Sequence, residues 1–272
     1  TASVVRYKGV QPETEVIPIM NNTNYRYLMP SMDPCDGNGE LRELISKPQN
    51  CSVSWAFAIT NSIEYAIMKM YFEHYDQIVE VSLSAQELID CVGVDGEDFD
   101  DEYDEKKGGC AGFSLATGFD YVSLYGIAYS ESYPHRNEKG ECRRKEIGEE
   151  HRYRIAGYEK PVTYNKLGLF DLMKRGPVAV TMGLDPQYFQ YYRSDRDGEF
   201  YFDSSSNQPS VYGVVVEYSQ FAVDGKDELA KYPYFAVETR LRGCDSMVFR
   251  LPILDTVENA NVGGIAGLAI RP

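Results

Sequence analysis

Cysteine and histidine are the side chains of this chain best suited to nucleophilic or metal chemistry, and both are few. The six cysteines are spread widely: Cys35, Cys51, Cys91, Cys110, Cys142 and Cys244. No two have the close spacing of a zinc knuckle, so we expect no metal site and no cofactor. The pattern favours three disulfides, or two disulfides and two thiols, in an oxidising compartment. The alternative is six buried thiols in a cytosolic protein.

The histidines are candidates for a general base, the group that takes a proton from a nucleophile. There are three, His74, His135 and His151, and all precede residue 152. We expect His74 in a long helix, His135 in a loop and His151 in the connection between two halves of the chain. None of these placements predicts a catalytic role.

Charge and hydropathy narrow the classes of partner. The formal net charge is -15, which argues against binding nucleic-acid phosphates or anionic membrane surfaces. The run 95–105 has eight acidic side chains in eleven positions. It lacks the ligand spacing of an EF-hand, so a solvated loop is favoured over a calcium site. No apolar run approaches the ~18 residues of a membrane span, and we expect no membrane insertion.

The elements that must position these side chains differ between the two halves. Residues 54–75 predict a long helix, because apolar side chains recur at helical spacing. Residues 82–91 predict a shorter helix with a capping box formed by Ser84 and Glu87. After residue 154, short β-rich runs alternate with turn residues: 177–182, 198–202, 211–218, 234–238 and 247–251. This segregation predicts an α+β fold of two lobes that meet at a cleft.

Motifs along the chain resemble those of one enzyme family. The run Cys51-Ser52-Val53-Ser54-Trp55-Ala56-Phe57 resembles the motif C-G-S-C-W-A-F of papain and the cathepsins. Further likenesses follow in the family's order: 28–33 to L-P-x-x-x-D, 83–91 to L-S-E-Q-E-L-V-D-C, 109–112 to G-C-x-G-G, 176–180 to G-P-V-x-V and 263–266 to C-G-I-A. The chain thus resembles the papain-like, cathepsin-like cysteine peptidases from about residue 28 onward. The resemblance implies a helical left lobe and an antiparallel, β-barrel-like right lobe.

The family's catalytic positions are replaced in this sequence. Ser54 stands in place of the nucleophilic cysteine, which by itself fits either a serine-variant enzyme or a substitution that blocks turnover. Val211 stands in place of the histidine and Thr239 in place of the asparagine that orients it. Pro48 occupies the position of the oxyanion glutamine and offers no donor. We therefore expect a catalytically inactive homologue rather than an enzyme.

The resemblance also implies covalent features. It implies the disulfides Cys51–Cys110 and Cys91–Cys142 in the helical lobe, and it leaves Cys35 and Cys244 as a further candidate pair. Asn21, in Asn21-Asn22-Thr23, is a candidate glycosylation acceptor. We expect a secreted, endolysosomal or vacuolar protein, since disulfides persist in oxidising compartments.

The expected organisation is an arm followed by one papain-like domain. Residues 1–27 predict an extended arm, the remnant of a prosegment end, and residues 28–272 the domain. Within the domain we expect a helical lobe at about 45–145, a β-rich lobe at about 146–255 and a crossing segment at 256–272. The chain begins at Thr1 without Met, which predicts a processed product.

These expectations favour a binding role over chemistry. The leading prediction is an inactive pseudopeptidase that binds a protein or peptide, as a decoy or capture protein, through its cleft or surface. The alternatives are a structural component of a larger assembly and a storage protein.

Overall fold

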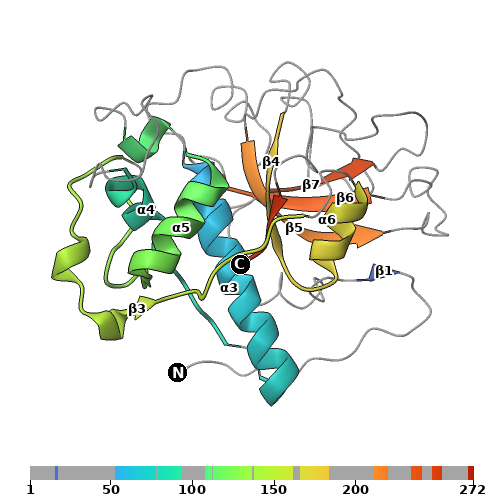
Figure 1. The fold of residues 1–272 in the computed structure, drawn as a ribbon, viewed down its shortest axis with the longest axis horizontal. Helices are drawn as coiled ribbons and strands as arrows, with labels where there is room; N and C mark the ends of the chain where they lie inside the picture. Colours follow the sequence, from blue (N-terminus) through green and yellow to red (C-terminus); the bar gives the residue numbers. More distant parts are fainter. Residues whose placement is uncertain are drawn as a thin grey trace.

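The computed structural model describes residues 16–17, 53–77, 79–93, 108–111, 113–136, 138–161, 166–183, 211–219, 234–240, 247–252 and 269–272. The helix α3 (Ser54–Tyr75) runs through the middle of the molecule. The helices α4 (Ala85–Cys91) and α5 (Leu115–Tyr125) lie on one side of it and the main sheet on the other (Figure 1). The predicted α+β fold with two parts is therefore confirmed, with helices beside an antiparallel sheet.

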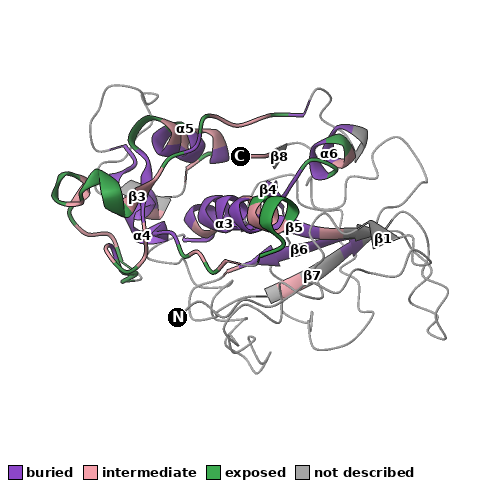
Figure 2. Ribbon diagram, turned by 90° about the horizontal axis from the view of Figure 1, so that it is seen from below, coloured by how far each residue is buried: buried purple, intermediate pink, exposed green. Residues whose placement is uncertain are grey.

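The helix α3 has the bounds that the apolar spacing predicted. Nearly all of its residues from Ser54 to Met68 are buried, because the other helices cover one side of it and the sheet covers the other (Figure 2). A helix covered on two sides needs no single apolar stripe. It ends at Tyr75. The C-cap Asp76 still donates its N–H to Phe72 O at 3.0 Å, and its left-handed backbone (φ 51°) turns the chain out of the helix.

The main sheet has the order β7-β6-β5-β4-β8, and every described pairing in it is antiparallel. Its strands are β4 (Val178–Met182), β5 (Val211–Ser219), β6 (Tyr234–Thr239), β7 (Met247–Pro252) and β8 (Ala269–Ile270). Four of them fall in runs predicted as strands, and the run 198–202 lies outside the described residues. The strand β1 (Val16–Ile17) pairs with β5 through Val16 and Ser219. The predicted division into arm and lobes stays a prediction.

Smaller elements complete the helical part and the connection to the sheet. The strands β2 (Ile127–Ala128) and β3 (Arg152–Tyr153) form an antiparallel pair. The helix α6 (Lys166–Met173) precedes β4. The described residues also include the short 3₁₀ helices η1 (Gly108–Ala111), η2 (Arg144–Glu146) and η3 (Glu149–His151).

The N-terminus of α4 corrects part of the predicted capping box. Ser84 is the N-cap, and its side chain accepts a hydrogen bond from Glu87 N at 3.0 Å, as predicted. The reciprocal bond is not made, because Ser84 N donates to Ala128 O at 2.9 Å. The helix begins at Ala85 rather than at 82, because Leu83 forms a β-bridge with Tyr129. The Glu87 carboxylate is therefore available to accept hydrogen bonds from another partner.

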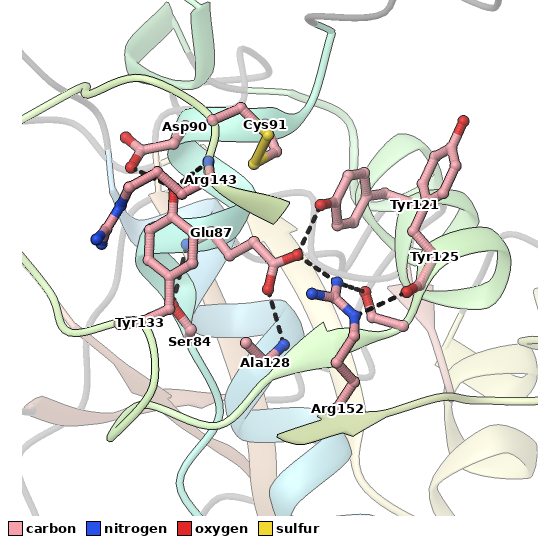
Figure 3. Close-up of polar contacts among 12 residues, drawn as sticks. Ser84, Glu87, Asp90, Cys91, Tyr121, Tyr125, Ala128, Tyr133, Arg143 and Arg152 are labelled. Carbon is pink, nitrogen blue, oxygen red and sulfur yellow. Dashed lines mark hydrogen bonds and ion pairs between the residues drawn. A yellow bond between two sulfur atoms is a disulfide. The ribbon is translucent and has the colours of Figure 1, made fainter. Parts of the chain in front are cut away.

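That partner is Arg152, and the two form a buried ion pair (Figure 3). The Glu87 side chain is fully buried and that of Arg152 is 3% exposed. Glu87 also accepts from Tyr121 OH at 2.8 Å and from Ala128 N at 2.7 Å. The same guanidinium donates to Gly126 O at 3.0 Å. One carboxylate thus ties α4, α5, β2 and β3 together.

Asp90, on the same helix, holds the loop that leads to Cys142. Its buried carboxylate accepts from Tyr133 OH at 2.9 Å, Arg136 Nη2 at 2.7 Å and Gly140 N at 2.6 Å. The next residue, Cys91, forms a disulfide with Cys142 (S–S 2.08 Å). Burial raises the pKa of the Tyr133 hydroxyl to about 12, so this hydroxyl stays a donor at ordinary pH. The loop is therefore fixed both covalently and by hydrogen bonds.

Several sequence predictions concern residues that the structure does not describe. Cys110 is disulfide-bonded, but its predicted partner Cys51 lies outside the described residues. So do Cys35, Cys244, Asn21, Pro48 and the acidic run 95–105. In the described ranges, no three His, Cys, Asp or Glu side chains gather as a metal would require. No helix in these ranges is long and apolar enough to cross a membrane.

Candidate functional site

Ser54 is the first residue of α3 and is 5% exposed. The preceding residue, Val53, has no side chain that could cap the helix. Ala56 N and Phe57 N donate to Val53 O at 3.0 and 3.3 Å. The earlier amides, of Ser54 and Trp55, have no partner within the helix and carry the positive end of its dipole. Ser54 thus places a hydroxyl beside backbone N–H groups that favour an approaching oxygen atom.

The facing ends of β5 and β6 hold the other two described candidates. Val211 begins β5 and Thr239 ends β6, and both are buried. Thr239 Oγ1 donates to Tyr212 O at 2.5 Å, which fixes the end of one strand to the start of the other. At Gly213 the strands approach so closely that a Cβ would lie 2.5 Å from Glu238 O. Glycine is therefore required at this position.

Contacts between α3 and the main sheet bring the end of β6 to the first turns of the helix. The helix packs against β5 and β6. The guanidinium of Arg240, the residue after Thr239, lies 5.1 Å from the ring centroid of Phe57, one turn after Ser54. We call the surroundings of Ser54, Phe57, Tyr212, Thr239 and Arg240 the α3–β5–β6 site. Two of the catalytic counterparts, Ser54 and Thr239, belong to this site, and Val211 directly precedes Tyr212 in β5, while the roles assigned to all three stay predictions.

The three histidines take the kinds of position that were predicted, but one of them lies closer to the site than expected. His74 is in the last turn of α3, about 30 Å from Ser54 at the rise of an α-helix. His151 is exposed in η3, with Nε2 at 3.7 Å from Glu150 Oε1. His135 lies in a loop, and its ring centroid is 5.0 Å from that of Phe57. It is the histidine whose ring contacts the first turns of α3.

Behind the site, buried polar groups cross the boundary between helix and sheet. Glu64 and Tyr65 extend from α3, and Glu238 extends from β6. The Tyr65 hydroxyl donates to Glu238 Oε2, and Glu64 Oε1 accepts from Leu83 N at 2.6 Å. Burial raises the pKa of Glu64 to about 7, and the charge of Glu238 adds to the rise, while the Leu83 hydrogen bond and Arg240 oppose it. We call these groups, with Arg240, the seam cluster.

Sequence reasoning missed the seam cluster and Arg240. In the run 234–241 only the candidate Thr239 was singled out, because the comparison was with catalytic positions. A signal was present. In the family that the chain resembles, this run reads Y-W-x-V-K-N-S-W-G, so Glu238 stands in place of its lysine and Arg240 in place of its serine. A change of charge within a strand that is otherwise apolar indicates altered buried electrostatics.

Comparison with known proteins identifies the family. The model of the papain family cysteine proteases matches residues 30–238. A cathepsin L-like proteinase of Fasciola hepatica is 27% identical over 144 residues, which are 52% of this chain and 38% of that protein. Cysteine proteinase 2 of Dictyostelium discoideum is 30% identical over 183 residues, 65% of this chain and 42% of that protein. The chain therefore spans about two fifths of the length of these relatives.

A solved structure shows the same fold. The crystal structure of the Carica candamarcensis cysteine protease CMS1MS2 in complex with E-64 superposes with a TM-score of 0.60. The match covers 82% of this chain and 89% of that one, at 19% identity. Identity this low supports the fold and not the chemistry.

The comparisons correct one expectation from the sequence. The prediction that the chain is not an enzyme is wrong at the level of its family, because the matched relatives are named proteinases and point to a protease. The prediction rested on the residues that replace the family's catalytic positions and on the placement of the three histidines. Since the family match extends over residues 30–238, this chain belongs to the papain family of cysteine proteases.

Proposed function

We propose that the chain recognises polypeptides and binds them in extended form at the α3–β5–β6 site. The observation that carries the proposal is the N-terminus of α3, whose N-cap Val53 provides no capping side chain and whose first turns lie beside Arg240, the residue after β6. Peptide carbonyl groups need N–H donors, and the first turn of a helix supplies them. A polypeptide is also the ligand that membership of a protease family makes most natural.

The other groups of the site suit the same ligand. Tyr212 is half-buried, and the hydrogen bond from Thr239 fixes its backbone. Tyrosine side chains are common at protein interfaces, because they combine an apolar ring with a polar hydroxyl. Arg240 adds a positive charge within a chain of net charge -15. These groups would let the site hold the backbone of a peptide and discriminate among its side chains.

A protein or peptide partner in a secreted or endolysosomal compartment fits the other observations. The disulfide Cys91–Cys142 requires an oxidising environment to persist. The net charge of -15 opposes nucleic acid as a partner, since binding to phosphates needs clustered cations.

The proposal is tested by retention of synthetic peptides on the immobilised protein, with mass spectrometry of what is retained and of what passes through. Tyr212→Ala should reduce retention about tenfold or more, as expected when an interface tyrosine is removed. Tyr75→Ala is the matched control, because Tyr75 is 64% exposed in the last turn of α3. It should leave retention unchanged.

Both assay outcomes bear on recognition. Peptides that are retained intact, or released as cleaved fragments, support polypeptide recognition, and the masses show directly which fate they meet. If the unaltered protein neither retains nor cleaves any peptide, the proposal is wrong. It is also wrong if Tyr212→Ala and Tyr75→Ala behave alike.

A further inference from the structure

The seam cluster lies at the buried boundary between α3 and the sheet. It holds two acidic side chains and one cation. Glu64 is 6% exposed on the helical side, and Glu238 is 8% exposed on the sheet side. Arg240 is the cation that faces them. Within the described residues it forms no ion pair with either carboxylate, and its buried Nε has no hydrogen-bond partner. Two acidic groups therefore share one cation that is not in direct contact with them.

Each acid is held by a group on the opposite side of the boundary or on a neighbouring segment. Glu238 of β6 accepts the hydrogen bond of the Tyr65 hydroxyl from α3. Glu64 of α3 accepts the amide of Leu83, in the segment that leads into α4. The charged groups that act on Glu64 are Glu238 and Arg240, both from the sheet side, and Tyr65 is its titratable neighbour on the same helix. Tyr65 has a pKa raised well above its usual value by burial, so it stays a neutral donor.

We propose that the seam cluster is an acid-closed latch: protonation of Glu64 holds the two lobes together, and its deprotonation loosens the boundary between them. With Glu64 neutral, one carboxylate faces Arg240 and every hydrogen bond of the cluster is kept. With Glu64 ionised, two negative charges are buried near each other, which costs free energy unless they are closely paired. Relief comes from admitting water between α3 and β6.

The pH window follows from the direction of the pKa shift. Burial raises the pKa of Glu64 from its usual 4.5 to about 7 in the folded chain. The folded state thus binds this proton more tightly than the unfolded state does. The stabilisation is complete below the unfolded value of about 4.5 and is lost as the pH rises through about 7. The latch therefore closes in acidic compartments and opens above neutrality.

The latch is connected to the α3–β5–β6 site by the chain itself. Glu238 directly precedes Thr239, which donates to Tyr212 O. Arg240 follows and lies over Phe57. Movement at Glu238 therefore shifts both the strand ends and the cation of the site. The latch extends beyond the proposed function, because the buried charges exist whether or not a polypeptide binds.

Thermal unfolding of the folded chain with intact disulfides, at about pH 4 and about pH 8, tests the latch. Glu64→Gln keeps an acceptor for Leu83 N but cannot ionise. Its melting temperature should equal that of the unaltered protein at the lower pH. At the upper pH it should be about 5 °C higher, the shift expected for a chain of this size. Glu73→Gln is the control, because Glu73 lies on the same helix with 54% of its side chain exposed. It should show no such pH-dependent difference.

A second measurement keeps the proposal testable if Glu64→Gln does not fold. Hydrogen exchange of the Leu83 amide in the unaltered protein, corrected for the intrinsic effect of pH, should lose at least tenfold protection between the two conditions. Equal protection at both values would overturn the latch. So would a difference in melting temperature between Glu64→Gln and the unaltered protein that does not change with pH. Neither result depends on peptide binding, so failure of the latch is distinguishable from failure of the proposed function.

Discussion

Removing Glu87 should destabilise this protein more than almost any other single change to a charged residue. Glu87→Leu leaves the guanidinium of Arg152, 3% exposed, without its carboxylate. It also leaves Tyr121 OH and Ala128 N without their acceptor (Figure 3). Breaking one partner of a buried ion pair costs about 3–5 kcal/mol. Since domains are stable by about 5–15 kcal/mol, the variant should retain only part of its stability.

The double variant separates the ion pair from general damage to the core. In Glu87→Leu with Arg152→Met the buried charge is gone, so much of the loss should be recovered. We expect a coupling free energy of about 2–3 kcal/mol from the double-mutant cycle. The matched control is the exposed pair Glu149 and Arg154. Their side chains are 81% and 49% exposed, and Arg154 Nη2 lies 3.5 Å from Glu149 Oε2. Its coupling should be about 0.5 kcal/mol or less.

Urea unfolding monitored by the fluorescence of Trp55 provides the assay. Trp55 is the only tryptophan, is fully buried, and donates from Nε1 to Gly109 O at 2.8 Å. Its environment therefore changes when the helical lobe unfolds. A loss below about 1 kcal/mol for Glu87→Leu would refute the reasoning, because that is the size expected of an exposed pair. Equal coupling in the buried and exposed pairs would also refute it.

Three further predictions concern other parts of the fold. Gly109→Ala should lower the free energy of unfolding by about 3 kcal/mol, because its Cβ would lie 2.3 Å from a backbone carbonyl oxygen of α4. The control Gly157→Ala adds a Cβ with no atom within 4 Å and should lower it by about 0.5 kcal/mol or less. The midpoints of urea unfolding measure both. Replacing Cys91 and Cys142 together by alanine should lower the free energy of unfolding by about 4 kcal/mol, because the disulfide joins residues 51 apart in sequence. A loss below about 1 kcal/mol would contradict this. Above neutral pH, Glu64→Gln should raise the free energy of unfolding by about 3 kcal/mol. Below the usual carboxyl pKa of 4.5 it should leave this free energy unchanged. Urea unfolding at the two pH values measures both.

The helix α3 and most strands of the main sheet could be predicted because their signals are local. The apolar spacing in 54–75 marks α3, and Ser84 marks the start of α4. The helix α5 was missed, although its sequence held the same kind of signal. Ser114 caps it by accepting from Thr117 N at 3.1 Å, and buried apolar side chains follow at helical spacing.

The partners of buried charges could not be predicted, because they depend on contacts between distant parts of the chain. Glu87 was predicted to turn back and cap α4, but Arg152, 65 residues away, holds it instead. The replacement of the family's lysine by Glu238 marked this position, but it did not tell which group of α3 would contact the carboxylate. Its burial follows from the packing of α3 against β6. Ser54, Val211 and Thr239 were found only because the resemblance pointed to those positions.

Hydrogen exchange of the protein with and without a retained peptide tests the central claim most directly, because it locates the bound polypeptide. The account predicts slower exchange in the first turns of α3, at the start of β5 and at the end of β6, around Ser54, Tyr212 and Thr239. Exchange around Tyr75, at the far end of α3, should stay unchanged. Protection confined to other surfaces, or no protection with any peptide, would contradict polypeptide recognition at the α3–β5–β6 site.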